Sequence, residues 1–294
     1  MERGPLMRMF IFGYGFSSAA AAAAVKERTD SVCFSCTVRS EEKAQRLEAA
    51  KIVAHLFDGS KPGQTLGPSL RQATHVVLSI PPGEAGDPAL VHHRADLDAA
   101  PLEWLCYYST VGVYGDFGGN WIDETAPLVP RNARSDRRVA AEQAWRDYAK
   151  ARGVPLAILR LAGIYGPGRS TFDKLRDGTA RRVVKPGQVF NRIHVADIGR
   201  VTALAAEQRL DGTFNLADDE PAPPQDLVSY AAGLMGIEPP PEIPYETAEF
   251  TPMQRSFYAD NKRVSNKAIK QALGLEMLYP NYRVGLDAIF EGEK

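Results

Sequence analysis

The sequence predicts an α/β protein with a doubly wound parallel sheet and a small C-terminal lobe. Short apolar or β-branched runs alternate with single helical patterns through the first two-thirds of the chain, which favours parallel strands joined by right-handed crossovers. These runs are apolar throughout, as expected for strands that helices cover on both faces. The 294 residues exceed the usual size of one domain, so the chain has room for both parts.

The predicted elements can be followed in order from the N-terminus. A strand in "RMFIFG" precedes an alanine-rich helix, and the later strands are "SVCFSCTV", "IVAHLF", "THVVLSI", "LEWLCYYS" and "PLAILRLA". After a basic, glycine-rich insert, "FNRIHVADIGRVTALAAEQ" resumes the strand-then-helix pattern, and "GTFNLAD" forms the last strand. We assign residues 1–165 and 190–217 to the sheet domain. Residues 166–189 and 218–294, with their proline-rich connections, form the predicted substrate-binding lobe.

The N-terminal segment has a second interpretation. Arg3 and Arg8 precede an apolar stretch and a run of alanines, which resembles a secretory signal with its cleavage site. Cleavage after the alanines would remove the first strand of a sheet whose later strands are all present. We therefore expect the segment to be retained and the protein to be cytoplasmic.

Composition excludes several classes of function. With 35 basic and 36 acidic residues interspersed, the chain lacks the charged surface typical of nucleic-acid or anionic-lipid partners. No apolar run approaches the roughly 20 residues of a membrane-spanning helix. The three cysteines, Cys33, Cys36 and Cys106, offer neither a disulfide framework nor a metal site and are expected to be buried thiols of a reducing compartment.

The segment "FGYGFSS" is typical of a dinucleotide-binding turn between a strand and a helix. Gly13 permits a tight turn, Gly15 lets the backbone approach a pyrophosphate, and Ser18 stands where a third glycine usually lets the helix pack closely. The alanines that follow are strong helix formers of small volume. We predict that residues 13–18, including Phe16 and Ser17, bind the cofactor phosphates at the N-terminus of the helix.

The end of the second strand favours NADP over NAD. An acidic residue that would bind a ribose diol is absent there, and Thr37, Arg39 and Ser40 offer a cation and hydroxyls suited to a 2′-phosphate, with Lys43 one turn further on. The alternative is that Arg39 is a solvated residue at a strand end.

Four further stretches, in order along the chain, give it a family resemblance: "YYSTVGVYGDFGGNWIDETAPLVP", "LRLAGIYGPGR", "FNRIHVADIGR" and "GTFNLADDEP". They resemble the extended short-chain dehydrogenase/reductases, the group that contains NAD-dependent epimerases and dehydratases. The resemblance implies that Thr110 hydrogen-bonds the substrate oxygen, with Ser109 beside it and Tyr114 facing the substrate. The alternative for Ser109 and Thr110 is a local backbone contact at a strand end.

The family's catalytic tyrosine and lysine are missing. Counting back from Glu142 in "RSDRRVAAE" places Arg138 at the lysine position and Arg134 at the tyrosine position. A guanidinium does not exchange protons at neutral pH, so neither replaces the tyrosine. Both could bind an anionic group, or form a solvated helix face. This departure resembles an atypical branch of the family, whose members keep the glycine turn and lack the pair.

The resemblance also implies roles for residues around the cofactor. Asp58 would meet the adenine, or else only close a turn. Ser79, Ile80 and Pro81 would lie beside the adenosine or pyrophosphate. Tyr165 would replace the missing proton donor, as could Tyr114, unless both are packed aromatic side chains. His194 is a candidate substrate contact, although a histidine in a strand is more often structural.

These observations predict an NADP-binding oxidoreductase, or epimerase or dehydratase, that acts on a small polar substrate, sugar-derived compounds included. The alternative is a non-catalytic NADP sensor or scaffold that has lost the catalytic pair. NAD is the second choice of cofactor, no metal is expected, and the helix that contains Arg138 suggests a homodimer. The sequence does not identify the substrate.

Overall fold

The computed structural model describes residues 6–293, apart from the side chain of Met253. Residues 1–5, including Arg3 of the signal-like segment, and Lys294 lie outside the described residues, as do the outer limits of the predicted domains. The chain divides into two compact units. The first comprises residues up to Val113, Pro130–Arg160 and Ile198–Phe214, and the second comprises Tyr114–Val129, Leu161–Asp197 and the residues from Asn215 onward.

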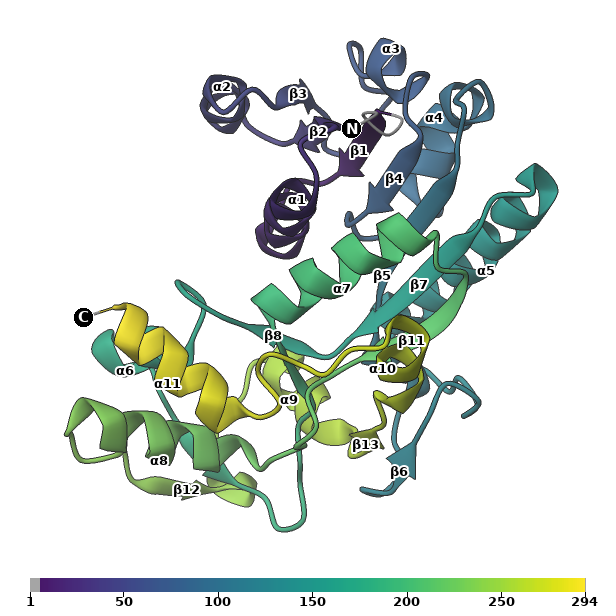
Figure 1. Cartoon of the computed structure of the whole chain (residues 1–294). Coiled ribbons are helices and arrows are strands. Elements are labelled where there is room, and N and C mark those ends of the chain that lie inside the picture. The colour runs from purple at the N-terminus through teal and green to yellow at the C-terminus, as the bar shows by residue number, and fades with distance from the viewer. Residues whose placement is uncertain (1–5, 294) are drawn as a thin grey trace. The chain divides into compact units, whose positions relative to one another are not determined.

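A seven-stranded sheet organises the first unit, with strand order β11-β7-β5-β4-β1-β2-β3 (Figure 1). Its strands are β1 (Met7–Phe12), β2 (Val32–Val38), β3 (Val53–Leu56), β4 (His75–Leu78), β5 (Trp104–Thr110), β7 (Leu156–Leu161) and β11 (Gly212–Leu216). The pairs β1·β2, β1·β4, β2·β3 and β4·β5 are parallel. This order, in which the chain runs outward from β1 in both directions, confirms the predicted doubly wound fold.

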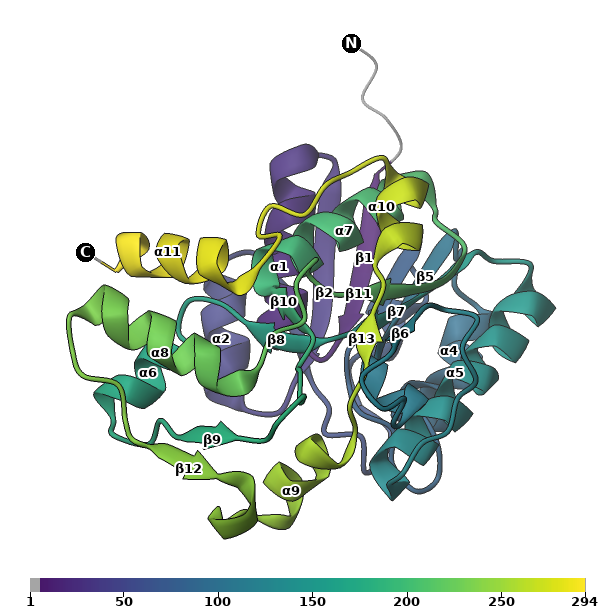
Figure 2. The same ribbon diagram turned by 90° about the horizontal axis from the view of Figure 1, so that it is seen from below.

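Helices cover both faces of this sheet. They are α1 (Phe16–Arg28), α2 (Glu41–Ala49), α3 (Gly67–Leu70), α4 (Pro88–Asp98), α5 (Ala133–Arg152) and α7 (Val195–Gln208). Phe10 and Phe12 of β1 pack in one core with Leu97 of α4 and Trp145 of α5, and Figure 2 shows these two helices side by side. Because side chains alternate along a strand, the neighbouring residues of β1 face the other helical layer.

The alanines of α1 allow close packing on that second layer. A Cβ atom added to Gly199 of α7 would lie 2.6 Å from the carbonyl oxygen of Ala20 in α1, closer than two such atoms can approach. Ala21 and Ala22 are buried here. The run that imitates a signal cleavage site is thus the packing surface of a helix that lies against another helix.

The second unit consists of short strands and helices. Its strands are β6 (Trp121–Ile122), β8 (Gly163–Tyr165), β9 (Arg182–Val184), β10 (Arg192–His194), β12 (Glu242–Pro244) and β13 (Arg263–Val264), paired as β10·β8, β12·β9 and β13·β6. Its helices are α6 (Thr171–Arg176), α8 (Pro224–Met235), α9 (Pro252–Ala259), α10 (Lys267–Leu273) and α11 (Tyr282–Gly292). Short 3₁₀ turns span Val111–Tyr114 and Tyr245–Thr247. The assignment of residues 166–189 and 218–294 to a substrate lobe stays a prediction.

The cysteine prediction was wrong at one position. Cys36 and Cys106 are buried thiols, but Cys33 is exposed, because it lies near the start of β2 where the strand has not yet entered the core. Within residues 6–293, no group of three histidine, cysteine or acidic side chains is arranged to hold a metal ion. The helices described are also too short or too polar to span a membrane.

Candidate functional site

The glycine turn lies between β1 and α1, where the sequence places it. Gly13 has φ +84°, a conformation that residues with a side chain rarely adopt. A Cβ atom on Gly13 would also lie 2.7 Å from Cγ2 of Ile80, at the end of β4. Both the backbone conformation and the contact with Ile80 therefore require glycine at this position.

Hydrogen bonds from the end of β2 hold the turn in place. The amide of Gly13 donates to Oγ1 of Thr37 (2.7 Å), and the amide of Tyr14 donates to the carbonyl oxygen of Thr37 (2.9 Å). Thr37 is fully buried, and its hydroxyl shapes the glycine turn. Contact of Thr37 with a ribose phosphate stays a prediction.

Ser18 does more than replace a glycine. Its hydroxyl accepts a hydrogen bond from the amide of Gly15 (2.8 Å) and donates one to the carbonyl oxygen of Gly13 (2.6 Å). Gly15 is the N-cap of α1, and the nearest heavy atom to an added Cβ there would be 4.0 Å away. There is therefore open space beside Gly15, at the N-terminus of α1. The first turn of this helix contains no acidic residue, so the positive end of the helix dipole is free to attract a phosphate.

Two cationic side chains follow β2. One is exposed, and the other is hydrogen-bonded to the glycine turn. Arg39 is exposed. Lys43 donates a hydrogen bond from Nζ to the carbonyl oxygen of Tyr14, in the glycine turn. Ser40 accepts a bond from the amide of Lys43 (3.4 Å) and so caps α2. Arg39 is thus the residue of this group best placed to meet a phosphate in solution.

The other predicted cofactor residues lie at the ends of β3 and β4. Asp58 is exposed and accepts bonds from the amide and hydroxyl of Ser60 (2.8 and 2.7 Å), which lower the pKa of its carboxyl group. This contact matches the turn that the sequence offered as the alternative. The amide of Ser79 bonds the carbonyl oxygen of Phe12 (2.9 Å), and Pro81 is exposed. Contact of these residues with a cofactor stays a prediction.

A buried ion-pair network lies behind the end of β5. Ser109 donates to Oε1 of Glu142 (2.6 Å), and Arg160 and Arg146 donate to Oε2 of the same carboxylate (2.8 and 2.9 Å). Burial alone would raise the pKa of Glu142, but the hydrogen bonds and charges of its partners outweigh burial and lower it. The hydroxyl proton of Ser109 is therefore used in the hydrogen bond to Glu142. Thr110, half-buried, accepts only a local bond from the amide of Gly112 (3.1 Å) among the contacts described.

The two arginines on α5 differ in their surroundings. Arg134 is exposed in the first turn of the helix. Arg138 is half-buried, and its Nη1 donates to the carbonyl oxygen of Tyr108 (2.6 Å) and to the hydroxyl of Tyr107 (3.3 Å). The guanidinium of Arg138 is thus anchored to β5, the strand that also carries Thr110.

The remaining predicted residues belong to the second unit. Tyr114 is fully buried and donates to Oδ1 of Asn215 (2.7 Å). The hydroxyl of Tyr165, also buried, lies 3.5 Å from the carbonyl oxygen of Asn281, and a Cβ on Gly285 would clash with it. These contacts give both tyrosines a packing role, and burial raises the pKa of Tyr165. Their catalytic or substrate roles stay predictions.

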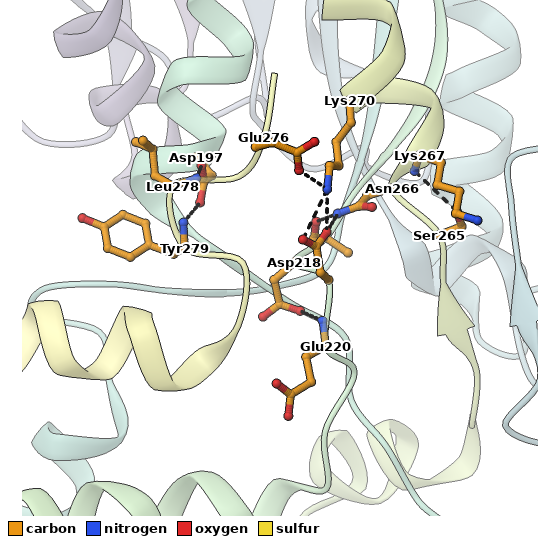
Figure 3. A network of polar contacts seen from close by, with 12 residues as sticks. Asp197, Asp218, Glu220, Ser265, Asn266, Lys267, Lys270, Glu276, Leu278 and Tyr279 are labelled. Carbon is orange, nitrogen blue, oxygen red and sulfur yellow. Dashed lines mark hydrogen bonds and ion pairs between the residues drawn. The ribbon is translucent and has the colours of Figure 1, made fainter. Parts of the chain in front are cut away.

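His194 packs among aromatic rings in the same unit. Its ring centre lies 5.2 Å from that of Tyr165 and 3.8 Å from that of Tyr279. Nearby, the two carboxylate oxygens of Asp197 accept bonds from the amides of Leu278 and Tyr279 (2.8 and 3.0 Å; Figure 3). Asp197 thereby holds the C-terminal segment at Leu278 and Tyr279.

Comparison with known proteins relates part of this chain to a family. The sequence model of the NAD dependent epimerase/dehydratase family matches residues 94–217. A conserved protein of unknown function from Silicibacter pomeroyi is 41% identical, with 97% of this chain and 99% of that one covered and a TM-score of 0.85. Residues 94–217 of this chain are thus similar to the NAD-dependent epimerase/dehydratase family.

Two further matches are more distant. A 3-diazoavenalumate denitrifying reductase from Streptomyces is 28% identical over 184 residues, which cover 56% of this chain and 58% of the reductase. A UDP-glucuronic acid 4-epimerase from Bacillus cereus, solved in complex with NAD, is 17% identical with a TM-score of 0.75, and 97% of this chain and 98% of the epimerase are covered. At that identity the epimerase supports the fold alone.

The structure shows one contact that the sequence analysis did not predict. Glu142 served there only to align its helix with a family motif, yet it is the centre of the ion-pair network. The sequence contained one sign of this network, because Arg160 is a charged residue inside the otherwise apolar strand "LAILRL". A buried arginine needs a carboxylate partner, and Glu142 supplies it.

The burial of His194 predicts a pH dependence of the stability of this chain. Burial lowers the pKa of His194 from 6.5 to about 4. Between these values the unfolded chain binds a proton that the folded chain excludes, so stability is lost as pH falls from about 6.5 toward 4. Over this pH range the protonation of His194 should cost the natural chain about 2 kcal/mol in free energy of unfolding. In His194→Asn we expect this loss to be absent.

The measurement is the free energy of urea unfolding at about pH 7 and pH 4.5 for both chains. The quantity to compare is the difference between the two chains, because burial raises the pKa of Asp218 to about 8 and gives both chains the same opposite trend. Equal losses in the two chains would show that His194 is not held neutral.

Proposed function

We propose that this chain is an NADP-dependent oxidoreductase that transfers a hydride between the nicotinamide and a small polar substrate, sugar-derived compounds included. The observation that carries the proposal is the glycine turn, which Thr37 and Ser18 hold open at the N-terminus of α1. The match of residues 94–217 to the epimerase/dehydratase family and the reductase named among the relatives support it.

Residues of the first unit fit this cofactor. The turn at Gly13 and Gly15 and the N-terminus of α1 would hold the pyrophosphate, and Arg39 would pair with the 2′-phosphate. When bound, the cofactor supplies or accepts the hydride. Thr110 would donate a hydrogen bond to the substrate oxygen, and Arg138, anchored to β5, would keep a positive charge beside that strand end without transferring a proton.

The exposed position of Arg39 predicts the choice between cofactors. In Arg39→Ala we expect the Kd for NADPH to rise about tenfold, because one charge-assisted contact is lost, and the Kd for NADH to stay unchanged. Titration of cofactor fluorescence measures both constants, and Arg46→Ala, an exposed arginine on α2, is the matched control. Equal weakening of NADPH and NADH would assign Arg39 a role other than phosphate recognition.

A second candidate function is a non-catalytic NADP sensor or scaffold. The observation that favours it is the presence of Arg134 and Arg138 where the resemblance implies a tyrosine and a lysine. A screen of small polar metabolites for oxidation or reduction with bound NADP separates the two functions. Turnover supports the enzyme, micromolar binding of NADP without turnover supports the sensor, and no binding of either dinucleotide contradicts both.

The sequence also suggests where and in what form the protein acts. We propose a cytoplasmic location, based on the three unpaired cysteines, and a homodimer formed through α5. Sedimentation of the full chain measures its oligomeric state.

A further inference from the structure

A cavity of about 470 Å³ lies in the first unit, away from the glycine turn. The C-terminal half of α5, the loop that leads into β7 and the start of β11 line it, and it is open to the surface. The amide of Leu105 bonds the carbonyl oxygen of Pro155 (3.0 Å), so β5 and β7 begin side by side. The cavity therefore lies at the amino ends of the strands, whereas the glycine turn and Thr110 lie at their carboxyl ends.

One side of the cavity is cationic. Arg146 and Lys150 line it from α5, four residues apart and hence on one face of the helix. Both hydrogen bonds described for Arg146 use Nη2, one to Glu142 and one to Oγ1 of Thr213 (3.1 Å). Its Nε and Nη1 groups remain as donors on a side chain that is about one-third exposed, and Lys150 is exposed. Two cations so placed suit a carboxylate.

Apart from the polar side chains of Thr213 and Asp211, the rest of the lining is apolar or glycine. Ala149, Leu156 and Ile158 form a buried apolar wall. Asp211 accepts a hydrogen bond from the amide of Leu156 through Oδ1 (3.0 Å) and lines the cavity beside the C-terminus of α5 at Gly153. A carboxylate and the negative end of a helix dipole both favour a hydrogen-bond donor at that end of a ligand.

We propose that this cavity is a second binding site, for a small carboxylic acid with an apolar body and a hydrogen-bond donor at its far end. Arg146 and Lys150 bind the carboxylate, the apolar wall packs against the body, and Asp211 accepts the donor. The volume suits such a molecule, because small-molecule sites measure roughly 300–1,000 Å³. The site is separate from the proposed cofactor site and does not require it to be occupied.

Arg146 connects the proposed site to β5, the strand that carries Thr110. Arg146 would contact a bound carboxylate through Nε or Nη1 and contacts Glu142 through Nη2, and Glu142 also accepts the hydrogen bond from Ser109, the neighbour of Thr110. This contact path runs within the first unit and gives the ligand a physical route to the end of β5. The occupancy of the cavity is tested first and on its own.

The test uses 4-hydroxybenzoate as the probe and the full chain, with binding followed by ligand-observed NMR. We expect saturable binding with a Kd of about 1 mM, since a ligand of this size gains only a few kcal/mol. In Lys150→Glu the Kd should rise about tenfold, because an attraction becomes a repulsion. Arg137→Glu, an equal change of charge on the same helix outside the cavity, should leave it unchanged.

Two further arms identify the groups and the place of binding. The uncharged 4-hydroxybenzamide should bind at least tenfold more weakly, since it lacks the carboxylate. Saturating NADPH should leave the probe bound, whereas displacement by NADPH would place it in the cofactor site and overturn the proposal. Lack of saturation at ten times the expected Kd, or equal binding to a folded Lys150→Glu chain, would also overturn it. Since NADPH binding is measured separately, failure of this site does not bear on the proposed function.

Discussion

Gly15→Ala is expected to bind NADP about a hundredfold more weakly than the natural chain while remaining folded. The backbone of Gly15, with φ −97°, is accessible to alanine, and the structure has room for the new methyl group. That room is where a pyrophosphate would approach the N-terminus of α1, so the methyl group displaces the ligand and not the protein. Because alanine is a poorer N-cap than glycine, we expect a loss of stability of no more than about 1 kcal/mol.

Two measurements test this prediction: titration of NADPH fluorescence and urea unfolding. The contrasting variant is Gly13→Ala, where the positive φ and the contact with Ile80 should weaken folding and binding together. If Gly15→Ala binds NADPH like the natural chain, the glycine turn is not the phosphate site and the proposed function loses its main support.

Glu142→Ala should lower the free energy of unfolding by about 3–5 kcal/mol, the range observed when one partner of a buried ion pair is removed. Glu142 is fully buried and accepts hydrogen bonds from Ser109, Arg146 and Arg160. Arg160 is itself 3% exposed, so the substitution removes two of its bonds in a place that water does not reach. Urea unfolding of the two chains measures the difference.

The matched control is Ser109→Ala, which removes one hydrogen bond from the same carboxylate and should cost about 1 kcal/mol. Glu142→Gln keeps the shape of the side chain without its charge and is expected to lie between the two. Equal stabilities for Glu142→Ala and Ser109→Ala would show that the ion pairs with the two arginines contribute nothing measurable.

The fold could be predicted because its signals are local. The apolar strands, the helices between them and the glycine turn each lie within about ten residues of sequence. The left-handed conformation of Gly13 and the close packing of α1 follow directly from residue size. The resulting strand order agrees with the predicted doubly wound sheet.

The roles of individual hydroxyl groups could not be predicted in the same way. Thr37 and Ser40 follow one another closely at the end of β2, and sequence alone offers both to a ligand. In the structure the hydroxyl of Thr37 accepts the amide of Gly13, which is 24 residues earlier, and that of Ser40 caps α2. The hydrogen-bond partner of a hydroxyl group depends on contacts between distant segments. These contacts form only when the chain folds.

The same limit applies to the second unit. Tyr165 is the last residue of β8 and lies in a motif that suggests chemistry, but Gly285 of α11 leaves the space into which its ring packs. Nothing near Tyr165 in the sequence indicates a glycine 120 residues later. The resemblance to a family fixes which residues are aligned, and it does not fix what each side chain contacts.

The hydrogen bonds around the glycine turn have a consequence for how a ligand is bound. Thr37 and Ser18 fix Gly13 and Gly15 through bonds that involve no ligand. The turn is therefore preorganised, and little backbone entropy remains to be lost when a phosphate arrives. The affinity of the glycine turn then depends on the groups that the ligand presents to it. A fragment that carries only the phosphates and the adenosine should already gain most of the binding energy of the whole dinucleotide.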